Sequence, residues 1–392
     1  MKSFTITEDQ IVRIIGAVSA DELSRRFNRY FDFLTISGWV PQTPLDRGGI
    51  GMSEVEMESC AQRVAAFFGL DAQLLERQLP ATISDWAGTI HGAVLGAAGA
   101  KLQKFAFKGA TRKNENLDCA HSAGEIYQYA AAAANLFYGR RRLLSFVAPH
   151  SLLGFILSVL TPNLQHIDAV DARGMTPELL SKTLRFGDVL IATPTLWRYM
   201  MREKVTAPDN TMAVSFGEAM TSELAAEMRK AGFGVMRELY GTTETGLVGW
   251  RDSVAEPFIL FDHWMRDGDR LVRIRPCGAE SHVDAMDMIE WMSDRNFKLG
   301  GRRDGAVQIG AVNVFPEQVT DVLSEHPRIK KCIVRAGRSG DGVNRLIAHI
   351  VLKPEFQPND ASAREIDAWC RMKLRQQERP RIYNFEVVLS AE

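Results

Sequence analysis

The stretch that decides the fold is Glu238-Leu239-Tyr240-Gly241-Thr242-Thr243-Glu244-Thr245-Gly246. The apolar run at 233–236 in front of it predicts a buried strand, which Gly241 is expected to end. In open α/β sheets, ligands bind beyond the carboxyl ends of the strands. There a Tyr ring covers a flat base, Thr hydroxyls donate to phosphate oxygens, and a carboxylate holds the Mg²⁺ of a nucleotide. The stretch therefore predicts a nucleotide site. The alternative is an ordinary strand-to-loop turn with solvated Thr and Glu side chains.

From residue 100 onward, predicted strands and helices alternate, which is typical of a mostly parallel sheet covered by helices. Apolar runs predict strands at 104–107, 143–147, 167–170, 188–192 and 212–215. Helical patterns predict helices at 152–160 and 222–230. Parallel strands would bring to one edge of the sheet the residues that follow strand ends, namely His150, Pro194, Gly217 and Tyr240.

The sequence predicts an α/β fold with a large N-terminal domain, residues 1–301, and a small α+β C-terminal domain, residues 302–392. Within the large domain, 1–100 is a helical lead that contains the capping box Ser53-x-x-Glu56, and 101–301 carries the nucleotide and acyl site. A chain of 392 residues suits two such domains. In the small domain the pattern predicts helices at 316–324 and 361–375 and strands at 332–336, 346–352 and 385–389.

The composition is that of a globular protein, with 46% hydrophobic and 24% charged residues. A net charge of −1 argues against a general nucleic-acid or membrane-surface binder. No apolar run approaches the roughly 20 residues of a membrane span, and 1–10 lacks the apolar core of a signal peptide. The five cysteines lie far apart, which predicts reduced thiols of a cytoplasmic protein, without a disulfide framework or a zinc site.

YGTTE at 240–244 resembles the YGxTE signature of the adenylate-forming superfamily, which comprises acyl-CoA synthetases, peptide-synthetase adenylation domains and luciferases. Other segments resemble this superfamily in the same order along the chain, from residue 100 to the C-terminus. They are the glycine-containing strand end 215–219, Pro149-His150 with Gly154, the segment 287–291, and the linker 299–304 with the run that follows it. The resemblance implies a small C-terminal domain that moves on a hinge at Asp304.

The resemblance implies that Thr243 and Glu244 are catalytic, with Thr243 on the phosphate and Glu244 on the Mg²⁺. His150 would be a third catalytic residue that walls the acyl pocket or contacts the carboxylate, and a hydrogen-bonded turn residue is the alternative. Asp287 would bind the ribose hydroxyls of ATP or AMP. The residues expected to contact the nucleotide are Gly109, Thr111, Gly217, Glu218, Ala219, Tyr240, Gly241, Thr242, Asp287 and Arg302.

The chain also departs from the superfamily. The phosphate loop, usually rich in Ser, Thr and Gly with a Lys, reads FKGATRK at 107–113, where only Gly109 and Thr111 fit well. Fewer glycines leave fewer bare N–H groups to close on a triphosphate. Ala311 stands where the superfamily has a Gly, and the sequence ends at Glu392, before the position of the superfamily's catalytic Lys. The nearest replacement cations are Lys108, Arg112 and Lys113, and we expect slow adenylation.

The resemblance implies an enzyme that activates a carboxylic acid, which we expect to be aromatic, with ATP and Mg²⁺ as acyl-AMP. The acyl group would pass to a thiol, an amine or a reductase in secondary metabolism, with CoA, a carrier protein or a reductase as acceptor. Among short members, the chain is similar to adenylating proteins of phenazine-antibiotic pathways. The alternative is a nucleotide- or aryl-acid-binding protein that has lost adenylation. An NAD-dependent enzyme is disfavoured because no GxGxxG follows a strand. A homodimer is one candidate for the oligomeric state.

Overall fold

The computed structural model of the 392-residue chain describes residues 6–77, 81–97, 104–111, 114–309, 312–338 and 344–386. The chain divides into two compact units. Unit 1 comprises Met1–Gly109, Asp118–Asp284 and Trp291–Lys298, and unit 2 comprises Ala110–Leu117, Ala285–Glu290 and Leu299–Glu392. The short segments 110–117 and 285–290 therefore group with the C-terminal part, whereas the sequence pattern assigned them to the large domain.

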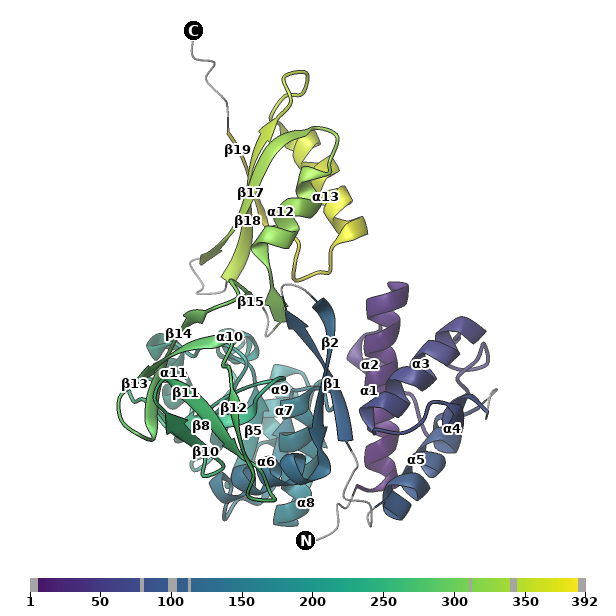
Figure 1. The fold of residues 1–392 in the computed structure, drawn as a ribbon, viewed down its shortest axis with the longest axis vertical. Coiled ribbons are helices and arrows are strands. Elements are labelled where there is room, and N and C mark those ends of the chain that lie inside the picture. The colour runs from purple at the N-terminus through teal and green to yellow at the C-terminus, as the bar shows by residue number, and fades with distance from the viewer. Residues whose placement is uncertain are drawn as a thin grey trace. The chain divides into compact units, whose positions relative to one another are not determined.

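The largest sheet has nine strands in the order β13-β14-β9-β8-β7-β6-β5-β3-β4. Strands β5, β8, β13 and β14 of this sheet are labelled in Figure 1. Its parallel strands are β3 (Arg142–Ser145), β4 (Asp168–Asp171), β5 (Asp188–Ala192), β6 (Met212–Ser215) and β7 (Val235–Thr242). The sheet continues antiparallel through β8 (Gly246–Arg251), β9 (Phe258–Leu260) and β14 (Asn296–Arg302), and ends at β13 (Asp287–Trp291). The predicted α/β class with a mostly parallel sheet is confirmed.

Helices between these strands pack on the sheet. They are α6 (Ala123–Leu136), α7 (Leu152–Phe155), the π-helix η1 (Ile156–Leu160), α8 (Thr161–Gln165), α9 (Pro177–Thr183), α10 (Pro194–Arg202) and α11 (Ser222–Lys230). Buried Trp197 of α10 and Met228 of α11 share a core with Leu144 and Leu190 of the sheet. Burial of such side chains contributes about 1.5–3 kcal/mol each. The helix predicted at 152–160 is thus α7 followed by a π-helical turn.

One prediction about the central stretch is wrong. Gly241 does not end the strand, because β7 continues to Thr242 and turns back antiparallel as β8. The register of the pair shifts between Tyr240 and Gly241, which marks a β-bulge. A Cβ on Gly241 would lie 2.3 Å from the carbonyl oxygen of Gly246, so glycine is needed for this close approach of the two strands.

The N-terminal part of unit 1 is helical, as predicted. It contains α1 (Glu8–Phe27), α2 (Phe33–Ser37), α3 (Glu54–Phe67), α4 (Gln73–Glu76) and α5 (Ile83–Ala97), and α1 packs on α3 and α5. The predicted capping box at Ser53 and Glu56 is present at the start of α3. A two-stranded ladder follows, formed by β1 (Lys104–Thr111) and β2 (Asn114–Ser122). Phe67 of α3 packs edge-on against Phe107 of β1, with ring centroids 5.1 Å apart.

A small antiparallel sheet completes unit 1. Its strands are β10 (Trp264–Asp267), β11 (Arg270–Ile274) and β12 (Glu280–Val283). The turn predicted at 267–269 joins the first two of them. None of the helices in the described ranges is long and apolar enough to cross a membrane.

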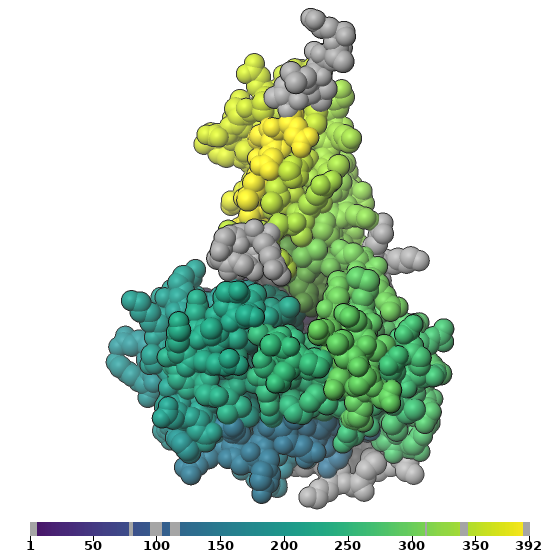
Figure 2. Space-filling model, turned by 90° about the vertical axis from the view of Figure 1, so that its left-hand side faces the viewer, coloured from purple at the N-terminus to yellow at the C-terminus, as the bar shows by residue number. Residues whose placement is uncertain are grey.

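Unit 2 is the α+β unit that the sequence predicts at the C-terminus (yellow-green to yellow in Figure 2). It contains β15 (Val307–Ile309), β16 (Val312–Val314), α12 (Pro316–Ser324), β17 (Ile329–Arg338), β18 (Asn344–Leu352), α13 (Asp360–Lys373) and β19 (Ile382–Phe385). Its sheet has the order β17-β18-β19, with β18 and β19 parallel. Leu323 of α12 and Ile366 of α13 are buried in one core with Ile350 of β18.

Candidate functional site

The central motif forms a tight turn between β7 and β8. The backbone N–H of Thr242 donates to Thr245 Oγ1 over 3.1 Å, and the N–H of Thr245 donates to Thr242 Oγ1 over 3.2 Å. Gly246 has a φ of +74°, and a Cβ on it would lie 2.2 Å from the Tyr129 ring. Only glycine fits such a position. These contacts fix the turn, in which Thr243 and Glu244 are both partly exposed.

The segment predicted as the phosphate loop lies against this turn, and its residues 107–111 belong to strand β1 instead of a loop. A Cβ on Gly109 of β1 would be 3.1 Å from Glu244 Oε1 and 3.7 Å from Thr243 Cβ. The backbone at 109 thus meets the two residues to which the resemblance assigns phosphate and metal. A missing side chain at this point lets a backbone approach a ligand closely. Of the predicted site, the structure brings together Gly109, Thr243 and Glu244.

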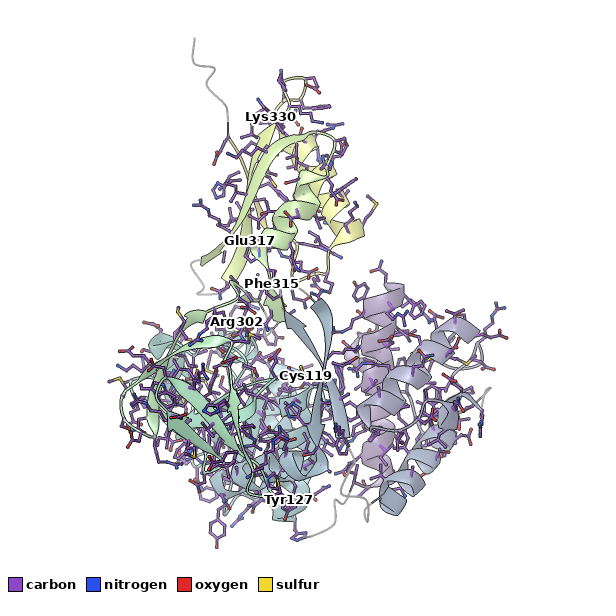
Figure 3. The ribbon with its side chains drawn as sticks, viewed as in Figure 1. Cys119, Tyr127, Arg302, Phe315, Glu317 and Lys330 are labelled. Atoms are coloured by element: carbon purple, nitrogen blue, oxygen red, sulfur yellow. The ribbon has the colours of Figure 1, made fainter. Side chains whose placement is uncertain are left out.

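A cysteine that the sequence analysis did not assign to the site completes this contact. Cys119 of β2 (labelled in Figure 3) has its Sγ 3.1 Å from the same Cβ position on Gly109. Burial raises the pKa of the Cys119 thiol to about 12, and the carboxylates of Glu244 and Asp118 add to the effect. The thiol is therefore neutral and is not a nucleophile at ordinary pH.

Two buried side chains, His121 and Tyr129, hydrogen-bond backbone carbonyls of the turn. His121 Nε2 lies 2.7 Å from the Thr243 carbonyl oxygen, which fixes Nε2 as the protonated nitrogen. The Tyr129 hydroxyl donates to the Thr245 carbonyl oxygen over 3.0 Å, and the guanidinium carbon of Arg273 lies 4.5 Å from the Tyr129 ring centroid. Burial lowers the pKa of His121, so the ring is neutral. His121 and Tyr129 are thus positioning residues for the motif backbone.

The predicted adenine segment follows β6 and is preorganised. Gly217 has a φ of +91°, which favours glycine. The Glu218 carboxylate accepts a hydrogen bond from the Thr195 hydroxyl over 2.9 Å and lies 3.6 Å from Arg198 Nη1. Ala219 is exposed. The side chain of Glu218 therefore stabilises the segment itself, and the role of the segment in binding adenine remains a prediction.

Tyr240 is buried, with 7% of its surface exposed. Its ring packs against Phe258 and Phe297, with centroids 5.9 and 5.7 Å away. An aromatic ring in such a cluster contributes packing energy as well as a surface for a ligand. Its contact with a base remains a prediction.

His150 lies beyond the end of β3 and faces α1. Its Nε2 is 3.8 Å from Asp21 Oδ1, and its side chain is 23% exposed. Burial lowers the pKa of His150 to about 4, although Asp21 acts in the opposite direction. The imidazole is therefore neutral at pH 7 and can donate or accept a hydrogen bond without carrying charge.

Three of the predicted nucleotide contacts belong to unit 2. Asp287 begins β13. Arg302, which is labelled in Figure 3, ends β14. Arg302 forms a bidentate pair with the Asp304 carboxylate, at 2.9 and 2.6 Å. Thr111 is the last residue of β1, and its side chain lies outside the described residues. The roles of these residues toward a nucleotide remain predictions.

Of the three cations that the sequence analysis proposed as replacements for the catalytic Lys, the structure describes Lys108. Lys108 Nζ lies 2.9 Å from Asp118 Oδ1, so this ammonium already has a carboxylate partner. Arg112 and Lys113 lie outside the described residues, as do Ala311 and the segment 387–392.

No group of three His, Cys, Asp or Glu side chains within the described ranges is arranged to hold a metal ion by itself. Mg²⁺ that accompanies a nucleotide is usually held by one or two carboxylates together with phosphates and waters. Glu244, beside the backbone of Gly109, fits that requirement as a single hard oxygen donor.

No family model matches the chain. A 4-coumarate–CoA ligase of Cereibacter sphaeroides is 29% identical over 302 residues, which cover 74% of this chain and 71% of the ligase. A 4-coumarate–CoA ligase of Halorhodospira halophila is 25% identical over 379 residues, with 96% and 95% covered. A malonyl-CoA ligase in complex with methylmalonyl-CoA and AMP has a similar fold, with a TM-score of 0.57, 16% identity, and 72% of this chain and 70% of that chain covered.

The match to the Halorhodospira relative covers nearly the whole chain and therefore both units, and the structural neighbour has a similar fold. They do not show the finer resemblance to phenazine-pathway proteins. In sequence the chain is similar to acid–CoA ligases, a class of adenylate-forming enzymes, and in fold it is similar to one of them.

Proposed function

We propose that this protein activates an aromatic carboxylic acid with ATP to give acyl-AMP and pyrophosphate, and then transfers the acyl group to the thiol of CoA. The observation that carries the proposal is the contact of the Gly109 backbone with Thr243 and Glu244. It supports one site for the phosphates of ATP, built from two segments more than 100 residues apart in sequence. The named substrate of two relatives, 4-coumarate, is an aromatic acid, which supports the substrate class.

In this proposal the carboxylate of the acid attacks the α-phosphorus, and the bond to the pyrophosphate oxygen breaks. Catalysis of phosphoryl-type transfer is mostly positioning and stabilisation of charge. Thr243 donates its hydroxyl to a phosphate oxygen, and Glu244 would hold the Mg²⁺ that neutralises the phosphates. His121 and Tyr129 keep the Thr243 and Thr245 carbonyls in place, so the turn needs no rearrangement during the reaction.

The acceptor is proposed from the relatives, which are named as CoA ligases. An amine, a carrier protein or a reductase as acceptor, and a role in antibiotic or other secondary metabolism, are alternatives within the same chemistry. A mobile C-terminal domain that turns on Asp304 belongs to the same proposal, since hinges are a few residues at the ends of elements.

A second candidate function rests on one ion pair. Lys108 precedes Gly109 on β1, and its pairing with Asp118 leaves it less free to stabilise a phosphate. A protein that binds a nucleotide or an aryl acid without adenylation would tolerate this arrangement.

Pyrophosphate exchange into ATP, measured with 4-coumarate, cinnamate and benzoate, tests the proposal. We expect exchange with at least one acid, and a loss of about 100-fold in Glu244→Gln, because removing one preorganised charge-stabilising group typically costs about 10²–10³ in rate. The exposed Glu227→Gln on α11 is the matched control and should leave the rate unchanged. Tight binding of AMP without exchange for any acid would favour the binding protein.

A further inference from the structure

Three alternate backbone carbonyls, at 243, 245 and 247, accept hydrogen bonds from buried rings. These rings, which we name the ring cluster, are His121, Tyr129, His263 and Trp264. The carbonyl oxygen of Leu247 accepts two of the bonds, from His263 Nε2 over 2.9 Å and from Trp264 Nε1 over 2.7 Å. The ring cluster therefore holds the backbone on both sides of Glu244 and into the first residues of β8.

Arg273 of β11 lies against the ring cluster and is itself only 3% exposed. Its guanidinium carbon is 4.5 Å from the Tyr129 ring centroid and 5.2 Å from the Trp264 ring centroid. Its Nη1 donates to the backbone carbonyl oxygen of His263 over 3.5 Å. A cation within about 6 Å of an aromatic ring centroid is attracted to the face of the ring. One guanidinium thus contacts three of the four residues of the ring cluster.

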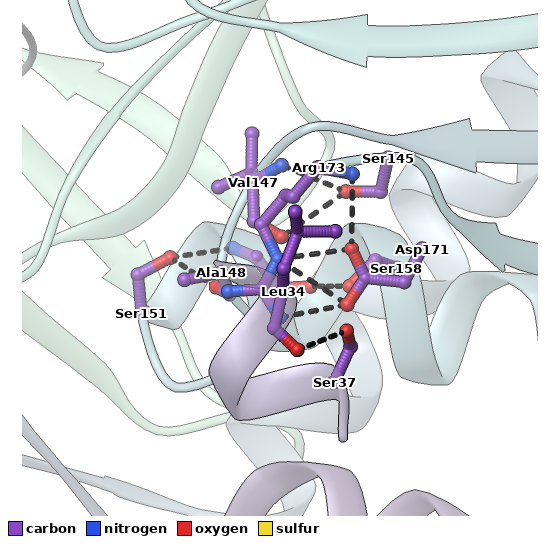
Figure 4. A network of polar contacts seen from close by, with 10 residues as sticks. Leu34, Ser37, Ser145, Val147, Ala148, Ser151, Ser158, Asp171 and Arg173 are labelled. Carbon is purple, nitrogen blue, oxygen red and sulfur yellow. Dashed lines mark hydrogen bonds and ion pairs between the residues drawn. The ribbon is translucent and has the colours of Figure 1, made fainter. Parts of the chain in front are cut away.

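The guanidinium of Arg273 is anchored by α6 and not by a carboxylate. Its Nη2 donates to Gln128 Oε1 over 2.7 Å, and Gln128 Nε2 donates to the Ile274 carbonyl oxygen over 3.2 Å. Within the described ranges Arg273 forms no ion pair with a carboxylate, and its buried Nε has no hydrogen-bond partner. Arg173, by contrast, is paired with both oxygens of Asp171, at 2.9 and 2.7 Å (Figure 4). A buried cation that is incompletely bonded is costly, so packing alone does not account for an arginine at 273.

The charge of Arg273 also acts on the protonation of the ring cluster. Burial lowers the pKa of His263 to about 3 and lowers the pKa of His121, and the charge of Arg273 contributes to both effects. Each imidazole is therefore neutral, and its single N–H donates to a carbonyl. Burial raises the pKa of Tyr129, whereas Arg273 acts in the opposite direction and makes the hydroxyl a stronger donor.

We propose that Arg273 is a positioning residue for adenylation, which acts through the ring cluster on the carbonyls beside Glu244. It would thereby fix the positions from which the Thr243 hydroxyl and the Glu244 carboxylate act on ATP. The inference rests on the proposed function and adds to it a residue outside the predicted nucleotide contacts. Groups that stabilise charge in a transition state are effective because their positions are fixed in advance. A misplacement of about 1 Å costs about 100-fold in rate, so a smaller loosening of the turn should cost about 10-fold.

A double-mutant cycle in pyrophosphate exchange tests this inference. Arg273→Met keeps an unbranched side chain and removes the charge, and we expect kcat to fall about 10-fold with the KM for ATP changed less than ~3-fold. In the double variant Tyr129→Phe, Arg273→Met the two losses should not multiply, because Arg273 acts through Tyr129. Arg273→Lys should recover most of kcat, since it keeps a cation at the rings. The exposed Arg270→Met on the same strand is the matched control and should keep the wild-type rate.

Two further measurements cover a variant that does not fold and a protein that does not turn over. Gln128→Met leaves Arg273 in place and removes the anchor of Nη2, so it should lower kcat by a smaller factor even if Arg273→Met is unfolded. Hydrogen exchange of the full chain, followed by mass spectrometry, reports on the turn without turnover. Peptides that contain 242–247 should exchange at least ~10-fold faster in Arg273→Met than in the wild type, whereas peptides that contain 142–145 should be unchanged.

The outcomes separate this inference from the proposed function. Losses of kcat that multiply in the double variant, or a wild-type kcat in both Arg273→Met and Gln128→Met, would overturn the positioning role and leave adenylation standing. If the wild-type protein exchanges pyrophosphate with no acid, the proposed function fails, and faster hydrogen exchange at 242–247 in Arg273→Met still supports the action of Arg273 on the turn. Unchanged hydrogen exchange at 242–247 in folded Arg273→Met would overturn that action.

Discussion

Gly109→Ala should damage the site through a single methyl group. The new Cβ would lie 3.1 Å from both Glu244 Oε1 and Cys119 Sγ, and 3.7 Å from Thr243 Cβ. Contacts of 3.1 Å are tighter than nine in ten real Cβ contacts, so the neighbours must move by a few tenths of an ångström. The Glu244 carboxylate is the end of a flexible side chain, and it is the group that would hold the Mg²⁺. The substitution therefore displaces the atom on which the proposed chemistry depends.

The size of the effect follows from that displacement. A misplacement of about 1 Å at a reacting group costs about 100-fold in rate, so a few tenths of an ångström should cost about 3- to 10-fold. Overpacking in a well-packed region costs about 1–3 kcal/mol of stability. Replacing Cys119 by Ala in the same chain removes one of the two closest contacts, so the Gly109→Ala, Cys119→Ala double variant should recover part of both losses.

Initial rates of pyrophosphate exchange, with KM for ATP and thermal unfolding, measure these effects. Gly88→Ala is the matched control, because a Cβ on Gly88 meets nothing within 4 Å and the residue lies in helix α5. That control should keep its activity and gain up to about 1 kcal/mol of stability. A Gly109→Ala variant with the wild-type exchange rate and KM for ATP would refute the assignment of the β1 backbone to the phosphate site.

Three further predictions concern the hydrogen bond of Tyr129, the proposed ribose contact of Asp287 and the protonation of His150. Tyr129→Phe removes the hydrogen bond to the buried Thr245 carbonyl and should cost about 1–3 kcal/mol of stability together with a lower exchange rate, whereas Tyr127→Phe should change neither in the same assays. Asp287→Ala should weaken AMP binding at least ~10-fold in calorimetry, and unchanged affinity in a folded variant would contradict its role on the ribose. Because burial lowers the pKa of His150 to about 4, protonation favours the unfolded chain, so stability should fall by roughly 3 kcal/mol between about pH 6.5 and pH 4. Denaturant unfolding across this window should show His150→Gln losing that dependence, while the exposed His282→Gln keeps it.

Elements with a strong and simple pattern were predictable. The strands Asp188–Ala192 and Met212–Ser215 and the helices Ser222–Lys230 and Pro316–Ser324 have the bounds that the sequence predicted. Parallel strands buried on both faces are continuous apolar runs, and a helix that starts at a cap or a Pro has a visible first residue. The resemblance added the order of the motifs, which is how Gly109 and Glu244 were assigned to one site before the structure placed them together.

The central strand illustrates why other bounds were missed. A single glycine after an apolar run is typical of a strand end, yet Gly241 allows a bulge and a close approach to Gly246 within a continuing hairpin. Whether the strand continues past Gly241 depends on its pairing with β8, and the apolar run at 233–236 does not reveal that pairing. Likewise, His121 and Tyr129 bond the motif across 122 and 116 residues, so no local spacing reveals them.

Residues of strand β2 contact Gly109, the Thr243 carbonyl and the Lys108 ammonium. Successive side chains of a strand point to opposite faces, so Cys119 and His121 share one face and Asp118 lies on the other. On the first face Cys119 meets Gly109 and His121 holds the Thr243 carbonyl. On the second face Asp118 pairs with Lys108. Loss of Asp118 would free Lys108 to interact with the phosphates in the proposed function. We therefore expect Asp118 to set how much of the Lys108 charge would reach a nucleotide bound at the proposed phosphate site.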